Sequence, residues 1–125
     1  MPTDAKRAAV ADMVQLFSTS DRAIVSDYRG LSVADLGALR ASLREHGITF
    51  RVVKNRLAKI AAEQAGRSDL ASLLEGPSAV VVGGDDEVRL ARALLDAIRP
   101  YRTVAVRGGI IAGSRVDTDG LTRLA

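Results

Sequence analysis

The stretch of sequence that decides the fold is residues 26–59, SDYRGLSVADLGALRASLREHGITFRVVKNRLAK. The apolar, partly alternating segment 23–28 (AIVSDY) predicts a strand, and the β-rich segment 48–53 (ITFRVV) predicts a second one. Between them, Ser32 with Asp35 three residues later has the pattern of a capped helix start. The predicted order is therefore strand, helix, strand, and then the start of another helix.

Basic residues stand at both strand-to-helix turns of this stretch. Arg29 and Gly30 occupy the first turn. Lys54 and Arg56 occupy the second, where Asn55 is a natural N-cap. The first backbone N–H groups of a helix are unpaired and carry partial positive charge, so a helix start attracts phosphate. A strand–helix–strand unit is normally a crossover between parallel strands, so both turns are expected at one edge of the sheet, where they predict a phosphate-binding site.

The rest of the chain continues the alternation of helices and strands. Thr3 is expected to cap a first helix whose apolar residues recur with helical spacing. After residue 59, the pattern predicts a short helical segment at 68–74, a buried strand at 79–82, a helix from Asp85 or Asp86 to Pro100, a strand at 103–106 resuming at 110–111, and a helix start at 117–124. The predicted fold is α/β (or α+β), with a four-stranded mixed sheet and packed helices, a ferredoxin-like (split βαβ) variant with inserted helices.

The composition excludes several classes of protein. With 125 residues, of which 47% are hydrophobic and 26% charged, the chain is long enough for one core and typical of a globular domain. It contains no cysteine and a single histidine, His46, so we expect no disulfide, no metal site and no cofactor. No apolar run approaches the roughly 20 residues of a membrane span. We expect a cytoplasmic protein without a membrane partner.

The charge is unevenly distributed along the chain. Residues 1–67 carry 11 Lys or Arg against 7 Asp or Glu, whereas residues 68–125 carry 7 against 8. A one-sided basic balance suggests an anionic partner. Because aromatic residues make up only 3% of the chain, base stacking on an exposed sheet is disfavoured as a mode of RNA recognition, and contacts to the RNA backbone are favoured.

The candidate site consists of the cations around the two turns and their neighbours. Its predicted members are Lys6, Arg7, Arg29, Gly30, Lys54, Asn55, Arg56 and Lys59, with Arg40 and Arg44 behind them on the intervening helix. Arginine pairs bidentately with phosphate, and lysine supplies a point charge. The alternative interpretation is a solvated basic surface. The concentration of cations at two helix starts that face the same way favours the site.

Enzymatic functions find little support in the sequence. Residues 108–113 have the outer glycine spacing of a phosphate loop, but Ser114 and Arg115 follow in place of Lys and Ser or Thr, so we interpret the segment as a turn. No Ser/His/Asp arrangement is expected around His46, which stands beside Gly47 at a helix end. We therefore expect no catalytic residue. Two alternatives stay open: a small α/β enzyme or sensor that binds a phosphorylated ligand at the same edge, and a protein-docking module.

Several short motifs, taken together, resemble the bacterial large-subunit ribosomal stalk-base protein, the L-ten family. They are YRGL at 28–31, LR at 39–40 and again at 43–44, VKNRLA at 53–58, GPSA at 76–79 and RGG at 107–109. Each motif is weak alone, but their order and spacing are specific and span essentially the whole chain. Position 56 is often Thr in the family pattern and is Arg here, which adds a cation.

The resemblance implies a structural, non-enzymatic constituent of the large ribosomal subunit that binds 23S rRNA at the stalk base, beside the L-eleven protein. In that family a C-terminal helix anchors dimers of the acidic L-seven/L-twelve protein, which recruit translation GTPases, and members also bind their own mRNA leader. The sequence ends at Leu124-Ala125, about where the linker to that helix begins in the family. We therefore expect residues 1–125 to be a single rRNA-binding domain without the stalk-dimer-binding helix.

Overall fold

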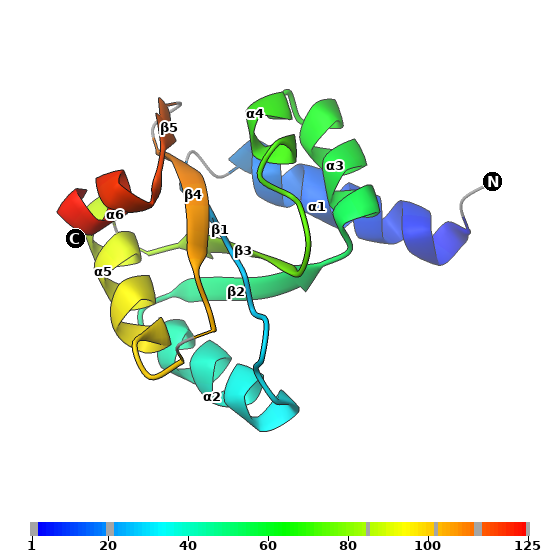
Figure 1. Ribbon diagram of the computed structural model, residues 1–125. Coiled ribbons are helices and arrows are strands. Elements are labelled where there is room, and N and C mark those ends of the chain that lie inside the picture. Colours follow the sequence, from blue (N-terminus) through cyan, green and yellow to red (C-terminus); the bar gives the residue numbers. More distant parts are fainter. Residues whose placement is uncertain (1–2, 20–21, 85, 102, 112–113, 125) are drawn as a thin grey trace.

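Figure 1 shows the computed structural model of the protein, which describes residues 3–19, 22–84, 86–101, 103–111 and 114–124. The elements are α1 (Asp4–Thr19), β1 (Arg22–Ser26), α2 (Val33–Arg44), β2 (Ile48–Val53), α3 (Asn55–Gln64), α4 (Ser68–Ala71), β3 (Ser78–Gly83), α5 (Glu87–Ile98), β4 (Val106–Ile111), β5 (Ser114–Val116) and α6 (Thr118–Leu124). The order of helices and strands follows the prediction, with α4 directly after α3 and a short β5 directly after β4.

The strands form one sheet in the order β2-β3-β1-β4-β5, and each neighbouring pair is antiparallel. β1 and β2 both run antiparallel to β3, which lies between them, so they run parallel to each other. The α/β class and the split βαβ arrangement are confirmed. The term "mixed" was wrong for the described strands, because the two parallel strands of the crossover are separated by β3. The short β5 extends the four predicted strands at the edge beside β4.

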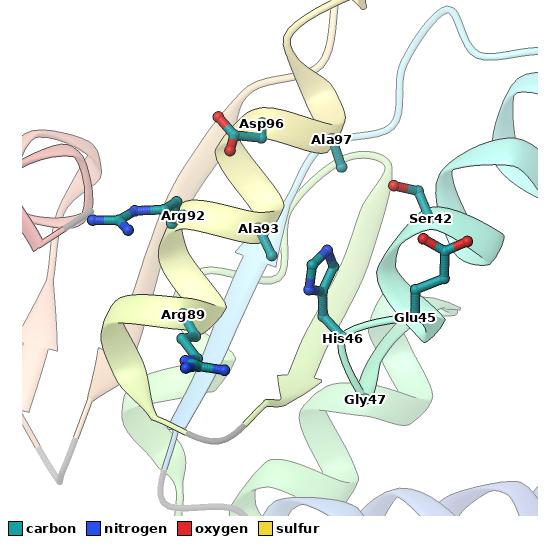
Figure 2. A pocket seen from close by; sticks show the side chains of 9 residues that line it. All are labelled: Ser42, Glu45, His46, Gly47, Arg89, Arg92, Ala93, Asp96 and Ala97. Atoms are coloured by element: carbon teal, nitrogen blue, oxygen red, sulfur yellow. The ribbon is translucent and has the colours of Figure 1, made fainter.

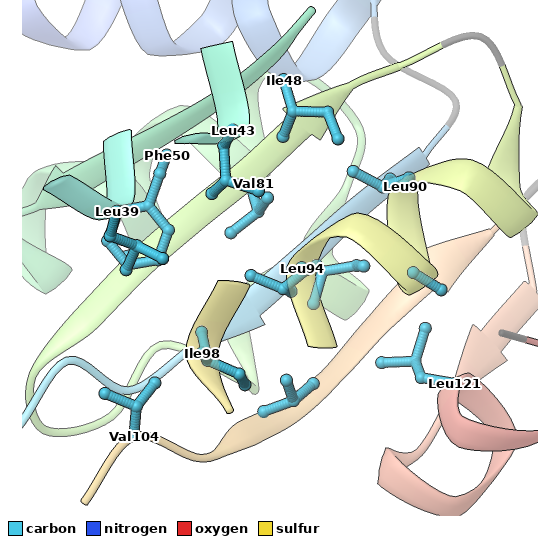
Figure 3. Packing of buried hydrophobic residues seen from close by; sticks show 14 of the residues in the cluster. Leu39, Leu43, Ile48, Phe50, Val81, Leu90, Leu94, Ile98, Val104 and Leu121 are labelled. Atoms are coloured by element: carbon cyan, nitrogen blue, oxygen red, sulfur yellow. The ribbon is translucent and has the colours of Figure 1, made fainter. Parts of the chain in front are cut away.

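Helices cover both faces of the sheet (Figure 1). Because side chains alternate across a strand, the central strands supply two cores. Ile24 and Val81 belong to the core with α2 and α5, shown in Figure 3. Val25 and Val80 belong to the core with α1, α3 and α4. Burial on both faces explains why β1 and β3 are nearly continuous apolar runs.

Local signals placed the first three helix starts with one error. Thr3 caps α1, since its Oγ1 accepts from the N–H of Lys6 at 3.2 Å. Ser32 and Asp35 form the expected capping box of α2. Asn55 was wrongly predicted as the N-cap of α3: Lys54 occupies that position without a side-chain cap, and Asn55 is the first helical residue. The amide of Asn55 bonds elsewhere, as described below.

The end of the chain differs most from the prediction. β4 starts at Val106 rather than at residue 103 and continues through the glycines that we interpreted as a turn; residues 112–113 of that predicted turn lie outside the described residues. Gly109 belongs in the strand because β1 runs very close to it, and a Cβ there would lie 2.7 Å from the carbonyl oxygen of Ala23. Asp86 caps α5 by accepting from the N–H of Arg89 at 2.8 Å, and Asp85 lies outside the described residues.

Candidate nucleic-acid interface

The two basic turns open at the same edge of the sheet. β1 ends at Ser26, which pairs with Ala79, and β2 ends at Val53, which pairs with Ser78. Both strand ends therefore flank the first residues of β3. This register confirms the predicted placement of the turns. We call the turn residues at this edge the basic rim: Arg29, Gly30, Lys54, Asn55 and Arg56.

The loop that precedes β3 connects the two halves of the basic rim. The Nδ2 of Asn55 donates to the carbonyl oxygen of Gly76 at 2.7 Å. The guanidinium of Arg29 lies against the same residue, since a Cβ on Gly76 would be 3.4 Å from its Nη2. Residue 76 also has φ +63°, a conformation that glycine adopts without strain. Gly76 therefore accepts a hydrogen bond from the second turn and lies beside the Arg29 side chain of the first turn.

Arg29 remains available to a ligand. Its side chain is 68% exposed, and its Nη2 lies 3.8 Å from Oδ2 of Asp27, whose Oδ1 accepts from the backbone N–H of Arg29 at 2.6 Å. An ion pair at this exposure contributes little to stability. The same Oδ2 lies 3.9 Å from Arg107, so one carboxylate is shared by two arginines. The cluster of these three side chains therefore keeps a net positive charge.

Arg107 is a structural member of this edge that the sequence analysis did not identify as a site residue. Its Nη1 donates to the carbonyl oxygen of Leu73 and to Oγ of Ser78, both at 2.8 Å, and its Nη2 donates to the carbonyl oxygen of Pro77. The pairing of β1 with β4 skips residue 107, so Arg107 is the extra residue of a β-bulge, which aims its side chain at this loop. In the sequence, this role was signalled only by the arginine that precedes Gly108 in the RGG motif.

Gly30 has a packing role in the first turn. It has φ +83°, and a Cβ at this position would lie 2.5 Å from Oγ1 of Thr103. The turn can therefore approach the segment before β4 only because residue 30 is glycine.

Lys6 lies near the basic rim, because it lines a hollow between α1, β2 and α3 that the rim residue Lys54 also lines. Both Lys6 and Lys54 line this hollow, whose volume is about 270 Å³, together with Arg51. Arg7 lies on the exposed side of α1, with its Nη1 4.0 Å from Oδ1 of Asp4. The structure thus brings Lys6 to the second turn, and Arg7 lies one residue further along α1.

The remaining predicted residues lie on α2 and α3. Arg56 and Lys59 are exposed and stand three residues apart on α3, on the same side of the helix. Arg40 is half-buried, and its Nε donates to the carbonyl oxygen of Phe50 at 3.2 Å, at the outer edge of β2. Arg44 is exposed in the last turn of α2, roughly 16 Å along the helix axis from its start. The structure therefore does not bring Arg44 to the basic rim.

A larger hollow lies at the opposite end of the sheet, between the end of α2 and α5 (Figure 2). Its volume is about 670 Å³, and its lining mixes charges of both signs: Glu45, Arg89, Arg92 and Asp96, beside Ser42, His46, Gly47, Ala93 and Ala97. In the part of the chain that the structure describes, no cluster of three or more His, Cys, Asp or Glu side chains could hold a metal ion. None of the described helices is long and apolar enough to cross a membrane.

Comparison with known sequences identifies a family and several relatives of this chain. The sequence model of the family described as Ribosomal protein L10 matches residues 1–98. A relative from Thermomicrobium roseum, named "Large ribosomal subunit protein uL10", is 42% identical over 99% of this chain and 71% of its own length. A protein of the same name from Micrococcus luteus is 40% identical over 100% of this chain and 72% of its own. A third, from Roseiflexus castenholzii, is 44% identical over 89% of this chain and 59% of its own.

The family match and the shared name of these relatives place the chain among the structural proteins of the ribosome rather than among enzymes. The chain belongs to the ribosomal protein L10 family. The predicted family, the ribosomal location and the non-enzymatic class are therefore confirmed. The alternative of a small phosphate-binding enzyme is not supported by this membership.

Proposed function

We propose that this protein is a structural constituent of the large ribosomal subunit and that its basic rim binds 23S rRNA at the stalk base. The observation that carries the proposal is the convergence of Arg29 and Asn55 on Gly76 at the edge where both strand-to-helix turns open. The names of the relatives, large ribosomal subunit protein uL10, support the assignment to that subunit.

The contacts that we propose are mainly to the RNA backbone. Arg29, Lys54 and Arg56 offer exposed or rim-facing cations, and the N–H groups at the start of α3 have no side-chain cap. Such a surface recognises phosphates and the shape of a folded RNA more than base sequence. Lys6, Arg7 and Lys59 extend the surface along α1 and α3. Arg40 is the outer member of the proposed site, whereas Arg44, in the last turn of α2, lies away from the basic rim and is expected to contribute little.

The partners follow from the same proposal. We propose that residues 1–125 act as one rRNA-binding domain beside the L-eleven protein. We also propose that the leader of the mRNA that encodes this protein binds at the same surface. The L-seven/L-twelve dimers that recruit translation GTPases are proposed to attach outside residues 1–125. The resemblance to the L-ten family supports each of these assignments.

The direct test is a filter-binding titration of this chain against a stalk-base fragment of 23S rRNA, with a scrambled RNA of equal length as the control. We expect tight binding to the stalk-base fragment, weak binding to the scrambled RNA, and an affinity that falls steeply with salt. Equal binding to both RNAs would contradict recognition of RNA shape. Saturable binding of inorganic phosphate without RNA affinity would favour the small-ligand alternative, and salt-insensitive binding to a protein would favour the docking module.

A further inference from the structure

The hollow beside the second turn has the lining of a small ligand site. Its walls come from three elements that are far apart in the sequence but converge in space: the first half of α1, the end of β2 and the start of α3 (Figure 1). Met13 and Val53 are buried there, and Leu57 is half-buried. The full lining is Ala5, Lys6, Ala9, Met13, Arg51, Val52, Val53, Lys54 and Leu57. An apolar interior is therefore bordered by charged side chains.

All ionisable side chains in this lining are cations: Lys6, Arg51 and Lys54. Beside Arg51 stands the carboxylate of Asp12, whose Oδ2 lies 4.0 Å from Nη2 of Arg51 and which is itself 74% exposed. One exposed carboxylate does not neutralise three cations. A ligand that fits this hollow therefore combines an apolar or planar part with negative charge.

The outer edge of β2 adds main-chain donors and acceptors to the hollow. β2 is an edge strand of the described sheet, so one of its sides has no strand partner. On this open side the Nε of Arg40 donates to the carbonyl oxygen of Phe50. Residues two apart in a strand direct their N–H and C=O groups to the same side. The N–H and C=O of Val52 therefore also face the open side, and Val52 lines the hollow. A paired donor and acceptor suit the polar edge of a nucleobase.

We propose that this hollow binds one unstacked nucleotide of the RNA. The base lies against Met13, Val53 and Leu57 with its polar edge at the main chain of Val52, and the adjoining phosphates lie between Lys6 and Lys54. The volume of about 270 Å³ is near the lower end of ligand pockets, so it suits one base rather than a duplex. This inference rests on the proposed function, because the nucleotide belongs to an RNA that the basic rim holds.

A filled hollow provides the test in the full chain. Ala9→Leu places a larger side chain in the hollow without changing any charge, and Ala8→Leu is the matched control, since Ala8 is exposed on the same helix outside the lining. We expect Ala9→Leu to weaken binding of the stalk-base RNA by roughly tenfold with an unchanged salt dependence, and Ala8→Leu to bind normally. Ala5→Leu, at the mouth of the hollow, is a second filling variant. Because Ala5 is exposed, a leucine there is not expected to disturb the packing of the core.

The RNA side of the test uses abasic replacements of each unpaired nucleotide of the stalk-base fragment. We expect one such replacement to weaken binding of the unchanged protein but to have no further effect on Ala9→Leu, because both remove the same contact. The proposal is overturned if no position behaves in this way, or if neither filling variant differs from Ala8→Leu. In those cases strong, salt-dependent binding to the stalk-base RNA would still uphold the proposed function, whereas loss of all RNA binding by the unchanged protein would refute both.

Discussion

The two ends of the sheet differ in a way that size alone does not reveal. The hollow between α2 and α5 is larger, about 670 Å³, but its arginines are accompanied by Glu45 and Asp96. At the basic rim the hollow is smaller, about 270 Å³, and its ionisable lining is entirely cationic. The nearby Asp27 is shared between Arg29 and Arg107. The difference in charge compensation, rather than in volume, is the reason that the basic rim and not the larger hollow is the proposed polyanion site.

The largest expected effect comes from removing cations at the second turn. Lys54→Ala combined with Arg56→Ala should weaken stalk-base RNA binding by roughly 10- to 100-fold at low salt and reduce the salt dependence by about 1–2 counterions, because both side chains are proposed to neutralise phosphates. The measurement is filter binding over a series of salt concentrations. Arg89→Gln with Arg92→Gln, at the opposite end, is the control pair. If the Arg89/Arg92 pair has the larger effect on RNA affinity, the RNA binds at the end with the larger hollow and not at the basic rim.

Substitution of Arg107 is expected to lower both the stability of the protein and its affinity for RNA. Arg107→Gln leaves the carbonyl oxygens of Leu73 and Pro77 without their donor and should lower the free energy of unfolding by about 1–3 kcal/mol. Urea unfolding measures this loss. RNA affinity should fall as well, because the loop that joins Arg29 to Asn55 is no longer held.

Arg123→Gln, on α6 at the other face of the sheet, is the control for loss of one positive charge. Arg107→Lys should recover only part of the stability, since lysine lacks the planar fork that bonds several acceptors. Full recovery by lysine would show that charge, and not the hydrogen-bond geometry, is what Arg107 supplies.

Substitutions at two helix caps, one at each end of the sheet, distinguish an effect on stability from an effect on RNA binding. Ser32→Ala at the start of α2 and Asp86→Ala at the start of α5 each remove a side chain that accepts a backbone N–H, at 3.0 Å and 2.8 Å. Each should cost about 1 kcal/mol in thermal or urea unfolding. Only Ser32→Ala should also weaken RNA binding, since α2 starts beside the first turn of the basic rim. Equal effects of both variants on RNA affinity would argue that the two ends do not differ in function.

The smallest effect is expected at Arg44. Because it stands in the last turn of α2, away from the basic rim, Arg44→Ala should change RNA affinity by less than about twofold, within the range expected for a distant surface charge. Filter binding at low salt is the measurement, with Arg29→Ala as the positive control. A loss comparable to that of Arg29→Ala would extend the interface along the whole of α2.

Local patterns predicted much of the fold and the position of the site. The capping box at Ser32, the alternating strands and the cations at the two turns are all properties of neighbouring residues, and the structure places them as expected. Patterns of neighbouring residues failed where a distant segment decided the outcome. The spacing of Val33, Leu36, Leu39 and Leu43 predicts one buried stripe on α2, but Val33 is 88% exposed, and only the other three residues of the stripe pack in or against the core. Asn55 was expected to cap its own helix but donates to Gly76 instead.

The sequence alone determined the order of elements, the edge at which both basic turns open and the family, because each depends on spacing along the chain. Only the tertiary structure decided that a bulge in the pairing of β4 with β1 turns Arg107 toward the loop at Gly76. It also decided that Lys6 joins Lys54 around one hollow. These contacts join residues far apart in the sequence, such as Leu73 with Arg107 and Ser26 with Val106, and their free energy arises only once packing has brought the segments together.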